Sequence, residues 1–312
     1  MKRIGKVCML AMGMLPCALT LCARSQSAAA DSNAPWRKQL LSWRIQRERE
    51  LSAPDGWLTL VGLEWLKSGV NSIGSAADCQ IKLHPGAPQH LGMITVIGRR
   101  VQLLSPAGGF PNDVKLDGAL AREGPLSVSD SKPSVIAWHG LTMVVLDRGG
   151  RYALRIKDAD SPTRTAFKGL HWYEPDPRYR VAAQWIPFAE PKIERIPTVI
   201  GTTLDLPSPG IADFTLDGKP FRLQPVLESG ETDKLFFILR DQTSQTTTYG
   251  AGRFLHAGLP DHGLKKPGQL ILDFNELYNP PCAYTPYATC PLPPEQNRLA
   301  VEIPAGEQRY LR

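Results

Sequence analysis

Apolar residues recur along this chain with two different periods. The first is helical and covers residues 33–51 (NAPWRKQLLSWRIQREREL), where Ser32 or Asn33 can serve as the N-cap and Pro35 lies in the first turn. The apolar members of this stretch fall near one face at helical spacing: Trp36, Leu40, Trp43 and Leu51. The pattern predicts an amphipathic helix that packs on the rest of the protein. Its polar face mixes acids and bases, which argues against a membrane-surface role.

After Gly56 the period changes to the alternation typical of strands. The runs are short and are separated by glycine, proline, Asp and Asn, as in WLTLVGLEWL, MITVIGRRVQLL and SVIAWHGLTMVVLDRGGRYALRIKD. The segment DRGG at 147–150 predicts one hairpin turn, and Asp217-Gly218 in LDGKPFRL predicts another. Together these patterns predict a mainly β protein.

One stretch interrupts the strand pattern. Residues 158–177 (DADSPTRTAFKGLHWYEPDP) contain three prolines and little periodicity, so we interpret them as a linker or crossing loop. This segment divides the chain into residues 31–157, with the helix and a β-sandwich, and residues 178–312, a second β-rich domain. No internal repeat of solenoid or propeller period is evident.

Residues 1–30 have the composition of a signal peptide. A basic start, MKRIGK, precedes the apolar stretch VCMLAMGMLPCALTL and the small residues that end ARSQSAAA. Ala28 and Ala30 fit the small-x-small rule for cleavage, so we expect a mature chain that starts near Asp31 in the periplasm or outside the cell. Lipid anchoring at Cys22 is the less favoured alternative, because a bulky leucine precedes this cysteine.

The net charge of the mature chain argues against a nucleic-acid partner. The full chain has 36 basic and 30 acidic side chains, but the expected signal segment contains four of the bases and no acid, so 32 bases face 30 acids after cleavage. A nucleic-acid-binding surface needs an excess of basic over acidic side chains that remains after the signal peptide is cleaved. No second apolar run is long enough to span a membrane.

Three cysteines follow the signal segment. Cys79 lies in the strand-like segment DCQIKL and is expected to be a small buried residue. Cys282 and Cys290 are separated by seven residues in a proline-rich loop, and a metal ion held by these two alone would lack ligands. A nucleophilic cysteine needs a nearby base and would be open to oxidation outside the cytoplasm. We therefore predict a disulfide between them, worth roughly 2 to 3 kcal/mol, and no metal or cofactor.

Residues 68–104, SGVNSIGSAADCQIKLHPGAPQHLGMITVIGRRVQLL, resemble the early part of a forkhead-associated β-sandwich. The resemblance implies phosphothreonine binding by an arginine after the Ile-Gly turn and a Ser-Arg pair on a later loop. Here Ser75 stands in the first place, Ala87 and Pro88 replace the pair, and of that loop only His90 fits. Alanine and proline cannot form a bidentate phosphate clamp, so we expect the fold without the phosphopeptide activity.

Most of the mature chain is similar to the bacterial domain-of-unknown-function family 1684. The matching segments include WLTLVGLEWL, FKGLHWY, LFFILRDQTSQTTTYGAGRFL and LDFNELYNPPCAYTPYATCPLPPEQNRLAVEIPAGE. The chain departs from the family pattern at Gln245, Leu277 and Tyr284. Because the resemblance implies no established activity, the chemistry has to be argued from the residues.

Polar and aromatic residues gather around the segment LDFNELYN that precedes the proline-rich loop. Asp273 and Asn275 would point to the same side of a strand, and Tyr278 and Asn279 follow directly. Arg253 follows two small residues in YGAGRFL and can bind a ligand anion or pair internally with Asp273. We predict that these five residues bind a small molecule or glycan fragment, a usual composition for a ligand site.

Two other function classes stay open. A hydrolase would use Asp273 or Glu276 with a histidine, and His256 is the candidate acid-base group because it follows Arg253 closely. The chain has no H-E-x-x-H or G-x-S-x-G motif that would name a reaction. Alternatively, Asp273 and Asn275 only brace the loop that follows, and the protein is a structural or interaction module. The sequence does not decide whether the protein is an enzyme.

Overall fold

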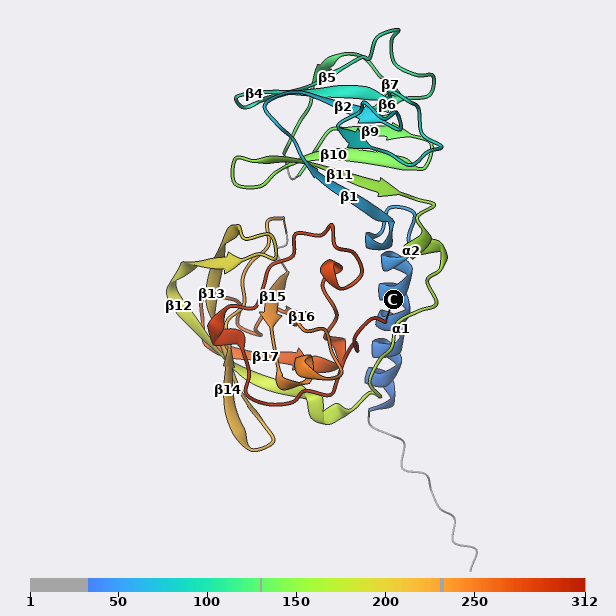
Figure 1. Cartoon of the computed structure of the whole chain (residues 1–312). Coiled ribbons are helices and arrows are strands. Elements are labelled where there is room, and N and C mark those ends of the chain that lie inside the picture. The colour runs from blue at the N-terminus through green and yellow to red at the C-terminus, as the bar shows by residue number, and fades with distance from the viewer. Residues whose placement is uncertain (1–32, 130, 231–232, 312) are drawn as a thin grey trace, which may run out of the picture.

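The computed structural model of this protein describes residues 33–129, 131–230 and 233–311, so the signal segment expected at 1–30 lies outside the described residues. Two β-rich lobes lie one above the other, and helix α1 (Ala34–Leu51) runs along the lower lobe (Figure 1). The prediction of a mainly β protein with a helix near its N-terminus is confirmed. Within the described residues, no helix combines the length and the hydropathy needed to cross a bilayer.

The upper lobe is a sandwich of two sheets. One sheet has the strand order β1-β11-β10-β9-β6-β7, with β1 (Leu60–Trp65), β11 (Tyr152–Asp158), β10 (Leu141–Asp147), β9 (Val135–Trp138), β6 (Lys115–Leu116) and β7 (Ala119–Leu120). The other has the order β3-β2-β4-β5-β8, with β3 (Ile81–Lys82), β2 (Gly69–Gly74), β4 (Gly92–Ile97), β5 (Arg100–Leu104) and β8 (Gly124–Pro125). Both sheets contribute to one core that includes Ile94, Met143 and Leu154. The predicted β-sandwich is therefore present, and the turn at 147–150 joins β10 to β11.

The lower lobe combines a four-stranded sheet with a hairpin. The sheet has the order β14-β13-β12-β17, with β14 (Lys219–Leu223), β13 (Thr203–Leu216), β12 (Arg180–Pro197) and β17 (Gly268–Asp273). The hairpin pairs β15 (Lys234–Leu239) with β16 (Arg253–Gly258), and both elements contribute to one apolar core around Trp185, Phe214 and Phe237. The predicted turn at Asp217-Gly218 joins β13 to β14, and both residues have the positive φ that such a hairpin turn requires.

Helix α1 buries the face that its apolar spacing predicts. Leu40 and Leu51 are buried, and Trp36 and Trp43 are half-buried. The helix contacts the lower lobe, whereas the sequence grouped it with the sandwich: Leu51 belongs to an apolar cluster with Tyr284, which follows the last strand of the lower lobe. The helix therefore forms one side of whatever cavity this lobe contains.

Charged residues on the same helix face hold the segment predicted to be a linker. The Arg44 guanidinium donates to the Tyr173 carbonyl at 2.9 Å and lies 4.8 Å above the Trp172 ring. The Glu48 carboxylate accepts from the Leu170 N–H and the Trp172 Nε1, both at 3.1 Å. After the short helix α2 (Pro162–Thr165), this crossing segment is thus attached to α1 by hydrogen bonds.

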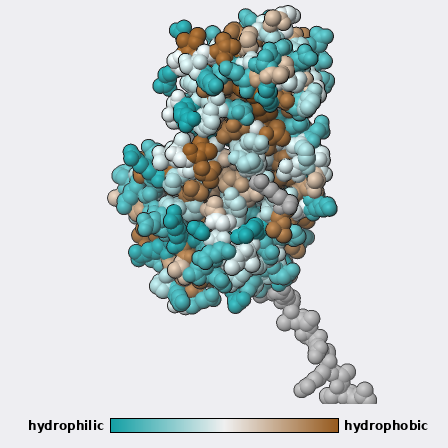
Figure 2. All heavy atoms as spheres, viewed as in Figure 1, coloured by the Kyte–Doolittle hydropathy of each residue, from teal (hydrophilic) through white to brown (hydrophobic). Residues whose placement is uncertain are grey.

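The proline-rich loop that carries Cys282 and Cys290 lies where the two lobes meet. Figure 2 shows apolar side chains on the surface at this junction. Thr285 Oγ1 donates to the Leu60 carbonyl of β1 at 3.0 Å. Cys79, Cys282 and Cys290 are free thiols in the structure, so it does not contain the expected disulfide. The Cys282 N–H donates to the Cys290 sulfur at 3.1 Å, which places the two residues in contact.

Candidate functional site

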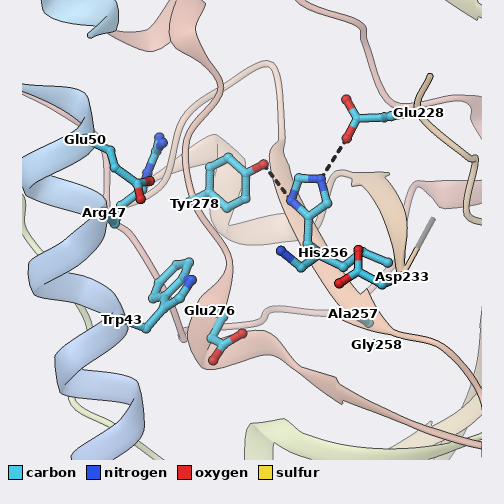
Figure 3. A pocket seen from close by; sticks show the side chains of 11 residues that line it. Trp43, Arg47, Glu50, Glu228, Asp233, His256, Ala257, Gly258, Glu276 and Tyr278 are labelled. Atoms are coloured by element: carbon cyan, nitrogen blue, oxygen red, sulfur yellow. Dashed lines mark hydrogen bonds and ion pairs between the residues drawn. The ribbon is translucent and has the colours of Figure 1, made fainter. Parts of the chain in front are cut away.

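A pocket of about 700 Å³ lies between helix α1 and the β15–β16 hairpin (Figure 3). Four acidic and two basic side chains line it, namely Glu50, Glu228, Asp233, Glu276, Arg47 and Lys234. Trp43, His256 and Tyr278 supply ring surfaces. The pocket has the mixture of aromatic area and a few polar groups that small-molecule sites usually have.

One helix face supplies the left wall in Figure 3. Trp43, Arg47 and Glu50 are spaced by four and three residues, so they project from the same side of α1. The Arg47 guanidinium lies 4.5 Å above the Tyr278 ring and donates to the Asn279 carbonyl at 3.0 Å. The Trp43 and Tyr278 ring centroids are 6.4 Å apart. Arg47 and Trp43 therefore hold the side of the Tyr278 ring that is directed toward α1.

The opposite wall follows from the alternation of side chains along β16. Arg253 and Leu255 point into the core, so Phe254 and His256 point to the other face, where the pocket lies. Beyond β16, the backbone of Tyr278 pairs with that of Phe254 through two hydrogen bonds of 2.9 and 3.0 Å. The His256 ring is stacked on Phe236 at 4.8 Å and lies nearly parallel to the Tyr278 ring, whose centroid is 5.9 Å away. The imidazole thus has Phe236 on one face and Tyr278 at its edge.

Hydrogen bonds at both ring nitrogens set the tautomer of His256. Nε2 lies 2.8 Å from a Glu228 carboxylate oxygen, and Nδ1 lies 3.0 Å from the Tyr278 hydroxyl (Figure 3). A carboxylate accepts, so Nε2 carries the hydrogen, and Nδ1 accepts from the tyrosine. Burial raises the pKa of the Tyr278 hydroxyl above its ordinary value, so this hydroxyl keeps its hydrogen and can donate it. The three side chains form one relay along the pocket wall.

Glu276 adds a carboxyl group with altered acidity. Burial, together with the nearby Asp273 carboxylate, raises its pKa from 4.5 to about 7. Arg180 and Arg44 act in the opposite direction but do not cancel these two effects. A carboxyl group with this pKa exchanges its proton near neutral pH, as a general acid or base must.

Arg253, predicted to bind ligand, lies in the core. It is 1% exposed, and its Nη2 donates to Asp241 Oδ2 at 2.8 Å and to the Ile303 carbonyl at 2.9 Å. It therefore makes an internal pair, the alternative that the sequence left open, but the partner is Asp241 and not Asp273. Arg253 and His256 are an odd number of residues apart on one strand and so face opposite ways.

Asp273 and Asn275 come together but do not line the pocket. Asp273 ends β17, and Asn275 belongs to the 3-10 helix η4 (Phe274–Glu276), so the two do not share a strand as expected. Asp273 accepts from the Asn275 N–H at 3.1 Å and from Trp36 Nε1 at 2.5 Å. The Asn275 amide accepts from and donates to the Asp176 backbone. These contacts hold the start of η4 to helix α1 and to the crossing segment at Asp176, and not to the proline-rich loop that the alternative interpretation of the sequence named.

Asn279 is buried beside the Glu307 carboxylate, which no pattern in the sequence indicated. Its Nδ2 donates to Glu307 Oε1 at 2.7 Å, and its N–H donates to Glu307 Oε2 at 3.0 Å. The Tyr284 hydroxyl donates to the same carboxylate. Of the five predicted ligand residues, Tyr278 alone lines the pocket, and the two weak catalytic candidates separate, with His256 in the pocket and Asp273 outside it.

Several pocket residues were missed because the sequence does not connect them. The spacing of Trp43, Arg47 and Glu50 was a usable signal, since it places a tryptophan beside two charges on one helix face. Nothing in the sequence links Glu228, in the loop before β15, to His256. Only the pairing of β15 with β16 brings that loop to the imidazole.

Comparison with known proteins relates the chain to a family and to solved structures. The family described as "Protein of unknown function (DUF1684)" matches residues 165–308. The solution NMR structure of an uncharacterized protein from gene locus rrnAC0354 of Haloarcula marismortui is 34% identical over 46% of this chain and 78% of that chain, with a TM-score of 0.40. A search of curated proteins gives no match.

Two forkhead-associated domains are also among the similar structures. The FhaA FHA domain, solved with the intracellular domain of Rv3910, is 19% identical over 30% of this chain and 97% of its own length, with a TM-score of 0.21. An FHA domain from work on phosphothreonine-dependent interactions is 20% identical over 32% of this chain and 96% of its own, with a TM-score of 0.21.

Proposed function

Because this chain belongs to the DUF1684 family, which is described only as proteins of unknown function, we propose a function from the site itself: the pocket beside α1 binds a small polar molecule or a glycan fragment. One observation carries the proposal. Trp43 and Tyr278 present ring surfaces to the same pocket of about 700 Å³ that the Glu228 carboxylate, held by the His256 ring, also lines as a hydrogen-bond acceptor. Aromatic area with a few oriented polar groups is the usual composition of such a site.

The charge of the pocket narrows the class of ligand. Four carboxyl groups and two basic groups line it, and one of the bases, Arg47, is already engaged with the Tyr278 ring and the Asn279 carbonyl. An anionic ligand would meet uncompensated carboxylates, and like charges at close range cost binding energy. Hydroxyl and amino groups, in contrast, can donate to Glu50, Glu228 and Glu276. The pocket therefore suits a neutral sugar or an amino sugar better than a phosphorylated or acidic one.

The proposal includes export from the cytoplasm. Residues 1–30 have a basic start, an apolar stretch and small residues at the end, which is the composition of a secretory signal. A protein exported in this way would start near Asp31 and meet extracellular or periplasmic glycans. N-terminal sequencing of the protein recovered from the periplasm or the medium tests this part of the proposal, and an intact Met1 would contradict it.

A thermal-shift screen followed by calorimetric titration tests the binding function. The ligand panel contains neutral oligosaccharides, amino sugars and their phosphorylated counterparts. We expect a neutral or amino sugar to raise the Tm, by an amount equivalent to about 2.7 kcal/mol at a hundred times its Kd. Trp43→Ala and His256→Gln should abolish the effect, because both side chains line the pocket.

Matched controls separate the pocket from general effects. His262→Gln changes an exposed histidine that contacts the Pro267 carbonyl and the neighbouring Asp261, and Ile45→Ala changes an exposed residue on the outer face of α1. Both control variants should bind as the wild type does. Equal affinity in Trp43→Ala, His256→Gln and the wild type would exclude this pocket as the binding site.

A second candidate, hydrolysis of the bound molecule, is favoured by one observation. Glu276, whose pKa is raised to about 7, and His256, hydrogen-bonded to a carboxylate, line the same pocket. Two titratable groups in one cleft are the minimum for general acid-base chemistry. Incubation of each hit with the protein, followed by product analysis, tests this. Turnover that is lost in Glu276→Gln while binding persists would support the hydrolase, and an unchanged ligand would exclude it.

A further inference from the structure

A second group of reactive side chains lies in the upper lobe, apart from the pocket. Asp78, Cys79 and His90 each offer one ligand atom, and the three atoms lie within 4.8 Å of one another. The Cys79 sulfur is 3.5 Å from His90 Nδ1, and His90 Nε2 is 3.7 Å from Asp78 Oδ1. Within residues 33–129, 131–230 and 233–311, no other set of three His, Cys, Asp or Glu side chains is arranged in this way.

We propose that Asp78, Cys79 and His90 bind one transition-metal ion of the Zn²⁺ class, with water as the fourth ligand. In a tetrahedral zinc site, a Zn–S bond of about 2.3 Å and a Zn–N bond of about 2.0 Å place sulfur and nitrogen roughly 3.5 Å apart. Cys79 and His90 already have this separation. The Asp78 carboxylate lies within 4.8 Å of the other two ligand atoms, and its side chain is 74% exposed, which leaves room for a change of rotamer toward the ion.

The two loops that carry these ligands are fixed against each other. The Ala76 N–H donates to the Gln89 carbonyl at 3.0 Å, which joins the loop after β2 to the loop before β4. A Cβ on Gly74 would lie 2.0 Å from the Gln89 oxygen and 3.0 Å from the Cys79 sulfur, so only glycine allows this approach. Cys79 and His90 are therefore positioned before any ion arrives, which is the arrangement that metal sites require.

The chemistry of the cysteine favours an ion over a substrate. Cys79 is 4% exposed, which leaves a small ion as the species that can reach its sulfur. The Cys79 thiol donates to the Gln89 carbonyl at 3.3 Å, which orients its sulfur beside the His90 ring. Metal binding replaces the S–H bond with an S–metal bond and releases one proton to the solvent. The Lys82 ammonium, bound to the Ala76 carbonyl at 2.6 Å, is positive and favours the thiolate.

Titration of the purified full chain with Co²⁺ and then with Zn²⁺ tests the proposal. We expect one equivalent of Co²⁺ to bind with a thiolate-to-cobalt charge-transfer absorption, and one equivalent of Zn²⁺ to remove that absorption. Cys79→Ser should abolish the band and His90→Gln should weaken the affinity at least tenfold, because each removes one ligand. His90 is partly exposed, so His90→Gln keeps the test valid even if Cys79→Ser does not fold.

Control variants decide which cysteine provides the thiolate. His84→Gln removes a nearby exposed histidine that contacts the Gly86 N–H, and Cys282→Ser removes a thiol of the lower lobe. Both variants should show the same band and the same stoichiometry as the wild type. The proposal is wrong if the wild type shows no charge-transfer band, or if the band persists in Cys79→Ser and disappears in Cys282→Ser.

Discussion

The imidazole Nε2 of His256 lies 2.8 Å from a carboxylate oxygen of Glu228, a residue in the loop between β14 and β15. Both side chains are only partly buried, so the pair is accessible from the pocket. The contact fixes the ring and directs Nδ1 to the Tyr278 hydroxyl. This relationship organises the candidate site, while most residues singled out in the sequence around Asp273 serve the scaffold.

Glu276 should make stability depend on pH. Its pKa is 4.5 in the unfolded chain and about 7 in the folded protein, so between pH 4.5 and pH 7 the folded state binds more protons than the unfolded state. The free energy of unfolding therefore falls as pH rises from 4.5 to 7. Relative to the wild type, Glu276→Gln should gain about 2 kcal/mol across this window, less than the full shift implies because the group is partly solvated. Urea denaturation of the variant and the wild type at pH 4.5 and pH 8 measures this difference in the free energy of unfolding. Glu190→Gln, at an exposed position, is the control and should show no gain.

Loss of the Arg253–Asp241 pair should destabilise the lower lobe strongly. The two side chains are 1% and 2% exposed, so Arg253→Met leaves a buried carboxylate without its partner. Breaking such a pair costs about 3 to 5 kcal/mol. The control is Arg195→Met, where the arginine is 82% exposed and 3.8 Å from Asp205, for which we expect less than about 1 kcal/mol. Equal midpoints of urea unfolding for the two variants would show that the buried pair contributes no more than a surface pair.

Asp273→Ala should separate a scaffold role from a binding role. The variant loses the acceptor for Trp36 Nε1 and for the Asn275 N–H, which should cost about 1 to 3 kcal/mol of stability. Binding should persist, because Asp273 does not line the pocket, and any change in affinity should follow the pKa of Glu276, which the Asp273 carboxylate raises. Thermal unfolding and calorimetric titration of the same sample give both quantities. A variant with normal stability that no longer binds the ligand would show that Asp273 takes part in binding. Asp213→Ala is the matched control, because this half-buried aspartate on β13 also accepts from an arginine, Arg222 at 2.9 Å, but lies outside the pocket.

Cys282 and Cys290 should form a disulfide when the protein is exported. They are free in the structure, but the Cys282 N–H already contacts the Cys290 sulfur. We expect peptide mass spectrometry of protein recovered from the periplasm to show the two joined and Cys79 unpaired. Reduction should then lower stability by roughly 2 to 3 kcal/mol. If both cysteines can be alkylated without prior reduction, the prediction is wrong. Cys282→Ser cannot form the disulfide, so it shows any other effect of the reductant on stability.

The sequence by itself determined the elements whose signal is local. The helix at Ala34–Leu51, the hairpin turn at 147–150 and the turn at Asp217-Gly218 each depend on spacing or turn chemistry within a few residues. The mainly β class and the family follow from many such segments taken together. Local periodicity reports which face of an element is apolar, and this is enough to predict the element itself.

Tertiary structure alone decided which side chains share a site. The pocket joins α1, the loop before β15, β16 and the segment after β17, and no spacing in the sequence relates Trp43 to Glu228 or either to Tyr278. The same holds for Arg253, whose strand position turns it to the core, where it meets Asp241. Side-chain direction follows from strand alternation, but the partner across a sheet or helix interface depends on long-range packing. That packing assembles the pocket from residues distant in the chain.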